Sequence, residues 1–496
     1  MKIWDTFYQK TYPFKHKMAV SDQRGGMTFQ QLFQSADEVA QNFSGAGIGP
    51  GDVVALALPN RTEFIIYYLA LCKLAAVTAL VSTKYQKSEL ISIIKGLKPL
   101  CFITSESQIF TETLDAKEMQ LPLKGRSSRL KLVFTGNERK LNRLTNIDES
   151  HAADVPALIK LTSGSTGVPK GILLSEDNVL AEAHNIVTTL DLMHTDVVFA
   201  AVPIFHSYGF DLGVLSMLYS GAHLILRDGF IPRKILQEIQ EQNVTLFLGT
   251  PSMYGFFIES QVSVPPDFSR VRFFISCTAP LASCTIDSFY HKFGAIICEH
   301  YGSSESGAAT IQTPEEVMNR RTSVGRPMHN VEIAIVDSDH NHLPPFCDGE
   351  VVISSRAVAR TYLMGKPADR NPLSNGMFMT GELGFLDHAG FLYLKGRLDK
   401  LINVGGLKVS PQEIVEVLES FPAVREAAVV GVSDRLGNES VYALVTVKEE
   451  VLENEILEFC RAQLAEYKVP RRIEIRHRLP KGPSGKIRVT GEDFQL

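Results

Sequence analysis

Short apolar runs typical of β-strands alternate with amphipathic helical patterns along most of the chain, and this alternation constrains the fold most strongly. The strand-like runs lie at 53–59, 197–204, 222–227, 244–250 and 271–277. Helical patterns accompany them at 178–190 and 233–242. Strands and helices that alternate at this spacing form parallel or mixed sheets covered by helices. The sequence therefore predicts an α/β fold with a large N-terminal domain.

Length and a change of pattern predict a second, smaller domain. At 496 residues the chain exceeds the size of an ordinary single domain. From residue 410 the order becomes helix, strand, strand, helix, with the helical patterns at 410–421 and 453–467 and the strand patterns at 424–432 and 440–447. We expect these elements to form a small α+β C-terminal domain.

Composition excludes several classes of protein. The hydrophobic content of 45% and charged content of 21% are typical of a globular enzyme or binding protein. A net charge of −5 argues against nucleic-acid binding. The seven cysteines form no CxxC pair, which gives no support to a metal or redox motif and favours a reducing, cytoplasmic location.

No segment predicts secretion or membrane insertion. The N-terminus lacks the apolar core of a secretory signal. The longest apolar stretch, 64–82, is interrupted by Lys73, and we interpret it as a buried helix followed by a strand rather than as a transmembrane segment. The charged stretch 135–155 is typical of a surface connection.

The stretch LTSGSTGVPKG, at 161–171, combines glycines, hydroxyl side chains and one lysine. Backbone N–H groups and hydroxyls in such a turn can surround a polyphosphate, with Lys170 as the countercharge. The stretch is not the phosphate loop of kinases and NTPases, because Pro169 precedes Lys170 and a glycine follows it. Strand-like runs flank the turn, and a helix is expected only after Ser175, a good N-cap. Composition alone leaves a phosphate-binding turn and a flexible polar loop as alternatives.

Further motifs accompany this turn in a defined order. They are GIGPGDVVALALPNRTEF (47–64), PIFHSYGF (203–210), SCTAPL (276–281), EHYGSSESG (299–307), SVGRP (323–327), the stretch 380–418, which begins with TGE, and LPKGPSGKI (479–487). With TSGSTGVPKG, this set resembles the adenylate-forming superfamily of acyl-CoA ligases, aryl-acid ligases and luciferases over nearly the whole chain. The resemblance is closest to the acyl-CoA ligases.

The resemblance implies an acid–thiol ligase. Such an enzyme uses ATP and Mg²⁺ to convert a carboxylic acid, here a fatty or aryl acid, into an acyl-adenylate with release of pyrophosphate. It then transfers the acyl group to the thiol of CoA. One alternative is an adenylation enzyme that loads the phosphopantetheine of a carrier protein, and another is a non-catalytic acyl-nucleotide binding protein. The presence of Glu305, Arg397 and Lys486 together favours an active enzyme.

The resemblance also assigns roles to residues, beginning with those expected around ATP. These are Thr162, Ser163, Gly164, Ser165, Thr166, Gly167, Lys170, Thr278, Ala279, Pro280, His300, Tyr301, Gly302, Ser303, Ser304, Glu382, Arg397 and Lys486. Glu305 and Thr166 are the expected metal ligands, and Lys486, His206 and Arg397 the expected catalytic residues. Glu382 stands where the family has aspartate; it keeps the charge and both acceptors but is longer by about 1.5 Å, one C–C bond.

The remaining assignments concern the acyl group and the thiol. The expected acyl pocket consists of His206, Tyr208, Gly209, Asp211, Gly302 and Ser303, in which the two glycines leave room for a chain or ring. Asp211 is expected either to bond a polar substituent or to face solvent at the pocket mouth. Asp399, Gly405, Gly406 and Lys408 match the family's pivot and thiol channel. The resemblance thus predicts an adenylation domain at 1–396, a hinge at 397–402 and a mobile C-terminal lid domain at 403–496.

Overall fold

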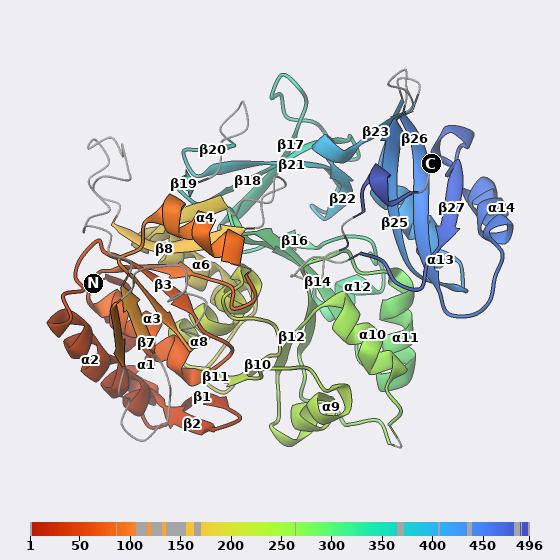
Figure 1. Cartoon of the computed structure of the whole chain (residues 1–496). Coiled ribbons are helices and arrows are strands. Elements are labelled where there is room, and N and C mark those ends of the chain that lie inside the picture. The colour runs from red at the N-terminus through yellow and green to blue at the C-terminus, as the bar shows by residue number, and fades with distance from the viewer. Residues whose placement is uncertain are drawn as a thin grey trace.

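Two large mixed sheets form the centre of the N-terminal part of the protein (Figure 1). A computed structural model describes residues 2–85, 87–105, 117–120, 131–134, 155–162, 170–262, 264–364, 372–404, 407–433, 439–480, 487 and 489–494. The fold class predicted from the sequence is confirmed: helices and mixed sheets make up a large N-terminal part, and a smaller C-terminal domain follows. None of the helices in these residues is both long and apolar enough to cross a membrane.

The first sheet has eight strands in the order β19-β9-β8-β4-β3-β5-β7-β6. Their bounds are β3 Val53–Ala57, β4 Val77–Leu80, β5 Cys101–Thr104, β6 Lys117–Gln120, β7 Lys131–Phe134, β8 Pro156–Thr162, β9 Lys170–Ser175 and β19 Thr361–Met364. The apolar stretch 64–82 contains all but the first two residues of helix α3 (Thr62–Lys73) and all of β4, both buried, as the sequence predicts. Most of the predicted connection 135–155 lies outside the described residues.

The second sheet has nine strands in the order β16-β15-β14-β13-β12-β10-β11-β1-β2. Their bounds are β1 Met18–Asp22, β2 Gly25–Thr28, β10 Val197–Ala200, β11 His223–Leu226, β12 Leu246–Gly249, β13 Phe273–Ser276, β14 Ile297–Ser303, β15 Gly307–Ile311 and β16 Arg326–Pro327. Strands β11, β10, β12, β13 and β14 are parallel, and their side chains are nearly all buried because helices cover them.

Helix α6 (Glu176–Thr189) joins the two sheets, since it packs against β8 and β9 of the first sheet and β15 of the second. Helices α9 (Pro232–Glu241), α10 (Pro251–Glu259) and α11 (Ser283–Phe293) lie together beside the second sheet (Figure 1). The other N-terminal helices are α1 Lys2–Thr11, α2 Phe29–Gly45, α4 Lys87–Leu97, α7 Ser207–Gly209, α8 Ser216–Ser220 and α12 Pro314–Val317, with a π-helical segment at Phe210–Leu215.

A third, antiparallel sheet lies between the large sheets and the C-terminal domain (Figure 1). It consists of β17 Val331–Val336, β18 Gly349–Ser355, β20 Leu373–Ser374, β21 Met377–Leu386 and β22 Leu392–Arg397. The C-terminal domain contains the hairpin β23 Ile402–Val404 and β24 Leu407–Val409, the sheet β25 Val424–Ser433, β26 Glu439–Val447 and β27 Arg472–Ile475, and helices α13 Pro411–Ser420 and α14 Glu453–Gln463. These elements follow the helix, strand, strand, helix order read from the sequence.

Candidate active site

The glycine-rich turn joins two antiparallel strands, as the sequence predicts. Thr162 at the end of β8 lies opposite Lys170 at the start of β9. Ser175 caps α6 by accepting the N–H of Asn178, while the Asn178 side chain accepts the N–H of Ser175. Residues 163–169, and with them Ser163, Gly164, Ser165, Thr166 and Gly167, lie outside the described part of the chain.

Lys170 contacts a side chain that the motifs do not identify. Its ammonium lies 5.7 Å from the ring centroid of Tyr362 on β19. The Tyr362 hydroxyl donates to Glu305 Oε1 at 3.0 Å, and Ala359 N–H donates to the Glu305 carbonyl. Burial, followed by the charge of Glu305, raises the pKa of Tyr362, so this hydroxyl remains a donor. Tyr362 therefore connects the expected phosphate lysine to the expected metal carboxylate.

A second group of side chains gathers where β14 meets the third sheet. The hydroxyl of Tyr301, which is largely buried, donates to Glu382 Oε2, and burial with the Glu382 charge raises the pKa of Tyr301. Glu382 on β21 lies opposite Arg397 on β22. Burial acts to lower the pKa of Arg397, but the hydrogen bond to Asp399 and the charges of Asp399, Glu382 and Glu305 outweigh it and raise this pKa. Arg397 thus lies in the field of both carboxylates that the resemblance assigns to nucleotide and metal.

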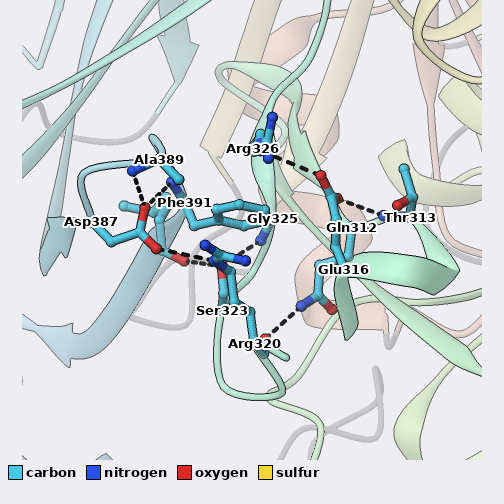
Figure 2. Close-up of polar contacts among 11 residues, drawn as sticks. Gln312, Thr313, Glu316, Arg320, Ser323, Gly325, Arg326, Asp387, Ala389 and Phe391 are labelled. Carbon is cyan, nitrogen blue, oxygen red and sulfur yellow. Dashed lines mark hydrogen bonds and ion pairs between the residues drawn. The ribbon is translucent and has the colours of Figure 1, made fainter. Parts of the chain in front are cut away.

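The SVGRP motif, at 323–327, contacts the start of β22, the strand that ends at Arg397. Figure 2 shows the Phe391 ring beside Arg320 and Arg326, whose guanidinium carbons lie 4.1 and 4.4 Å from its centroid. Arg320 pairs with Asp387, and Ser323 Oγ donates to the carbonyl of Leu392, the first residue of β22. The motif therefore acts on the site through the position of β22.

The turn at 203–210 contacts the hairpin that carries Glu305. Ser207 Oγ and Ser304 Oγ are 2.5 Å apart, in a hydrogen bond that no motif identifies. Tyr208 is buried and its hydroxyl donates to the carbonyl of Ile275 at the end of β13. His206 precedes α7 and is half-buried. His300 lies beside the Tyr208 ring and its Nδ1 donates to the Thr310 carbonyl; burial lowers the pKa of His300 to about 4, which leaves the ring neutral.

The structure excludes one of the two alternatives for Asp211 and corrects the reason given for the two glycines, while a bond from Asp211 to a polar substituent stays a prediction. Asp211 does not face solvent, because it is 2% exposed and pairs with Lys160 Nζ at 2.6 Å. Gly209 and Gly302 do not leave empty space, since a Cβ would lie 2.5 Å from the Pro203 carbonyl oxygen and 2.4 Å from that of Gly307, respectively. Both glycines are required by the close approach of two backbone segments.

The strand end at 276–281 adopts an unusual backbone conformation. Thr278 has φ of +82°, which is rare for a β-branched residue and is found where the surrounding structure compensates for strain. Ala279 and Pro280 are exposed beside it. Ser303 Oγ, at the end of β14, lies 3.0 Å from Ser306 Oγ.

The residues expected to serve the thiol lie at the start of the C-terminal domain. Asp399 accepts the Arg397 Nε–H at 2.9 Å, and the backbone of Lys408 lies opposite Asn403 in the β23–β24 hairpin. Gly405, Gly406 and Lys486 lie outside the described residues. The Ser410 hydroxyl donates to the Lys395 carbonyl and so links α13 to β22.

The donors near Glu305 fit a magnesium ion. The described residues contain no group of three His, Cys, Asp or Glu side chains arranged around a common point. Mg²⁺ needs no such cage, since it typically takes one or two carboxylates together with phosphate oxygens and waters. Glu305 is half-buried, accepts one hydroxyl, and follows the hydroxyl side chains of Ser303 and Ser304. This all-oxygen set suits a hard cation.

Comparison with known proteins identifies the family of the chain. The family model for the AMP-binding enzyme matches residues 7–363, and the model for the AMP-binding enzyme C-terminal domain matches residues 413–486. The chain therefore belongs to the AMP-binding enzyme family. It is an ATP-dependent acid–thiol ligase of the adenylate-forming superfamily.

Curated relatives and solved structures extend over nearly the whole chain. An oxalate–CoA ligase from Arabidopsis thaliana is 31% identical and covers 98% of this chain and 96% of its own length. The long-chain-fatty-acid–CoA ligase FadD13 from Mycobacterium tuberculosis is 30% identical, with coverages of 93% and 91%. The crystal structure of ATP-bound MatB from Rhodopseudomonas palustris has a TM-score of 0.83 at 26% identity and covers 98% of this chain and 97% of its own.

Proposed function

We propose that the two side-chain groups described above bind ATP from opposite ends. Glu382, Arg397 and Tyr301 hold the ribose and adenine, whereas Thr162, Lys170 and the turn between them hold the terminal phosphates. The observation that carries this proposal is the continuous path Lys170–Tyr362–Glu305, with Arg397 in the field of both Glu305 and Glu382. This path supports the proposal, because a reaction between two anions requires cations and a metal-binding carboxylate within one site.

The reaction proceeds in two displacements. An oxygen of the substrate carboxylate attacks the α-phosphorus of ATP, the bond to pyrophosphate breaks, and pyrophosphate leaves with the bonding electrons. The thiol sulfur then attacks the acyl carbon, loses its proton, and AMP leaves. Arg397 and Lys486 hold the anionic groups in line in the first step, and His206 lies on the acyl side. Mg²⁺, when bound at Glu305 and Thr166, supplies charge neutralisation on the phosphates.

We also propose the division into an adenylation domain at 1–396, a hinge at 397–402 and a lid domain at 403–496 that rotates between the two steps. The match of Asp399 to the family's pivot supports it. In the described part of the chain, Asp399 lies in the short segment Leu398–Lys400 between the third sheet and the β23–β24 hairpin, where a change of backbone angles would rotate the lid.

The acid is proposed to belong to one of the classes that the relatives use. Because these relatives range from an oxalate ligase to a long-chain fatty acid ligase, the test is a panel. Pyrophosphate release is measured with ATP and each of oxalate, short and long fatty acids and aromatic acids, with and without CoA. One acid should stimulate release strongly, and its CoA thioester should accumulate only with CoA. Release from no acid in the panel would contradict the proposal.

CoA is the proposed acceptor, and a carrier protein is the alternative. Both thiols end in the same pantetheine arm, so the panel is repeated with a phosphopantetheinylated carrier protein in place of CoA. The proposed location is the cytoplasm, which the seven free cysteines support. Cell fractionation with an antibody against the chain tests it.

A further inference from the structure

Three charged side chains are buried together beneath the candidate site. Lys160 on β8 is 2% exposed, Glu182 on α6 is 1% exposed, and Asp211 on the π-helical segment is 2% exposed. Each element also carries or adjoins a part of the site: β8 leads into the phosphate turn, the π-helical segment follows His206, and α6 touches the hairpin of Glu305.

The contacts of the three side chains link these elements. Lys160 Nζ donates to Asp211 Oδ2 at 2.6 Å. Glu182 Oε1 accepts the backbone N–H of Ala308 at 2.7 Å, three residues beyond Glu305. The Glu182 carboxyl lies so close to Gly307 that a Cβ there would be 2.2 Å from its Oε2. Glu182 therefore touches the backbone of the β14–β15 hairpin directly.

The charges balance only if one carboxyl holds a proton. Two carboxyls and one ammonium are buried together, and an uncompensated charge in such a place is costly. Glu182 Oε2 and Asp211 Oδ1 have no hydrogen-bond partner among the described residues. Burial, and next the charge of Asp211, raises the pKa of Glu182 to about 8, although Lys160 opposes this. Asp211 also faces Tyr68 of α3, which in turn faces Cys72 and Glu176.

We propose that Lys160, Glu182 and Asp211 are positioning residues that fix the Glu305 hairpin relative to β8, the strand that ends at Thr162. This inference rests on the proposed roles of Glu305 and Lys170. With Glu182 protonated the cluster is neutral and compact. Loss of that proton places two carboxylates against one ammonium, and the repulsion displaces Glu182 together with the Ala308 backbone that it holds. The metal and phosphate contacts then lose their alignment, so that the KM for MgATP rises.

The test uses the adenylation half-reaction, in which no thiol takes part. The KM for MgATP is measured by pyrophosphate release between about pH 6.5 and 9.5 for the wild type and Glu182→Gln. For the wild type, KM should rise about tenfold as the pH passes the Glu182 pKa of about 8. The glutamine still accepts the Ala308 N–H and cannot ionise, so Glu182→Gln should show no such rise.

A matched control separates the cluster from other buried carboxyls. Glu419 of the lid domain also accepts a backbone N–H, that of Ala427 at 3.1 Å, and burial raises its pKa to about 7. Glu419→Gln should leave the alkaline rise in KM unchanged. A rise that persists in Glu182→Gln, or that disappears equally in Glu419→Gln, would overturn the inference.

Two further measurements keep the inference testable whatever the activity. Should Glu182→Gln not fold, Asp211→Asn also abolishes the charge excess and must remove the rise. If the protein shows no activity, that result counts against the proposed function alone. The inference about the cluster is then tested by apparent unfolding temperatures. Glu182 has a higher pKa in the folded than in the unfolded protein, so its proton stabilises the folded state. This stabilisation is complete below the unfolded pKa of about 4.3 and is lost as the pH rises to the folded pKa of about 8. The wild type should therefore lose stability relative to Glu182→Gln across this range, and a constant difference would refute the cluster.

Discussion

Glu382 stands where the resemblance implies an aspartate, and in the structure the longer side chain has a specific partner. Its Oε2 accepts the Tyr301 hydroxyl from the neighbouring strand, a contact that the family motif alone does not reveal. An aspartate at this position would withdraw the carboxylate by about 1.5 Å and lose the bond. The surroundings are thus adapted to the longer side chain.

We therefore expect Glu382→Asp to weaken ATP binding, although it introduces the residue that the resemblance implies at this position. Hydrogen bonds to charged groups contribute about 1.5–3 kcal/mol, so KM for ATP should rise roughly tenfold or more. In the Tyr301→Phe background the bond is already absent, and the same substitution should have little further effect. The four KM values from pyrophosphate release form a double-mutant cycle. Additive effects would show that the two side chains act independently.

Glu305→Gln removes the charge proposed to face the metal while keeping the acceptor for the Tyr362 hydroxyl. Pyrophosphate release should fall by about 10² and require more Mg²⁺, since contacts of this kind to reacting phosphates are worth about 10²–10³ in rate. Glu315→Gln, an exposed carboxylate on α12, is the control and should behave like the wild type. An unchanged magnesium titration for Glu305→Gln would remove this residue from the metal site.

At the scale of elements, the link between the SVGRP segment and β22 depends on Gly325. Its φ is +99°, and a Cβ there would lie 2.1 Å from the Ile311 carbonyl carbon of β15. Gly325 also bridges to Leu392 at the start of β22 (Figure 2 shows the surrounding contacts). Only glycine allows β15 and β22 to be held this closely.

Gly325→Ala should therefore destabilise the protein by about 2 kcal/mol or more, since backbone strain alone costs about 1–3 kcal/mol and the clash adds to it. It should also raise KM for ATP through the displacement of β22 and Arg397. The control is Gly294→Ala at the end of α11, where φ is +66° but a Cβ meets nothing within 4 Å. Denaturant unfolding and KM are measured for both. Equal destabilisation by the two variants would mean that the close approach at Gly325 contributes nothing.

The sequence predicted elements better than it predicted contacts. Local periodicity and capping patterns predict strands β8 and β9 around the glycine turn, the Ser175 cap and the order of α3 and β4. Tyr362, Ser207 and the Lys160–Asp211 pair were not predicted, since each partner lies far away in the chain and no spacing connects them. The sequence identified the glycines at 209 and 302 as special but for the wrong reason. A close approach of two backbone segments and an open pocket both require glycine, so the sequence does not distinguish them.

In the whole molecule, few polar contacts connect the lid domain to the rest among the described residues. The ion pair of Arg425 with Glu259 spans 3.8 Å, with both side chains about half exposed. Such surface pairs contribute about 0–1 kcal/mol, so this one would oppose the proposed rotation of the lid only weakly. Ser410 and Lys395 provide a further link, directly beside the proposed hinge.

Lys486→Ala tests whether the lid works in two positions. Adenylation should be nearly abolished, by about 10²–10³ in rate, because the cation proposed to join the carboxylate to the α-phosphate is lost. The same variant, supplied with a pre-made acyl-adenylate and CoA, should form thioester at a rate comparable to the wild type, since the lysine has then left the site. Gly406→Trp should do the opposite, sparing adenylation while it obstructs the proposed thiol channel. Both half-reactions are measured for both variants. Equal damage to the two half-reactions by Lys486→Ala would mean that the lid occupies one fixed position, in which the lysine serves both steps or the stability of the domain.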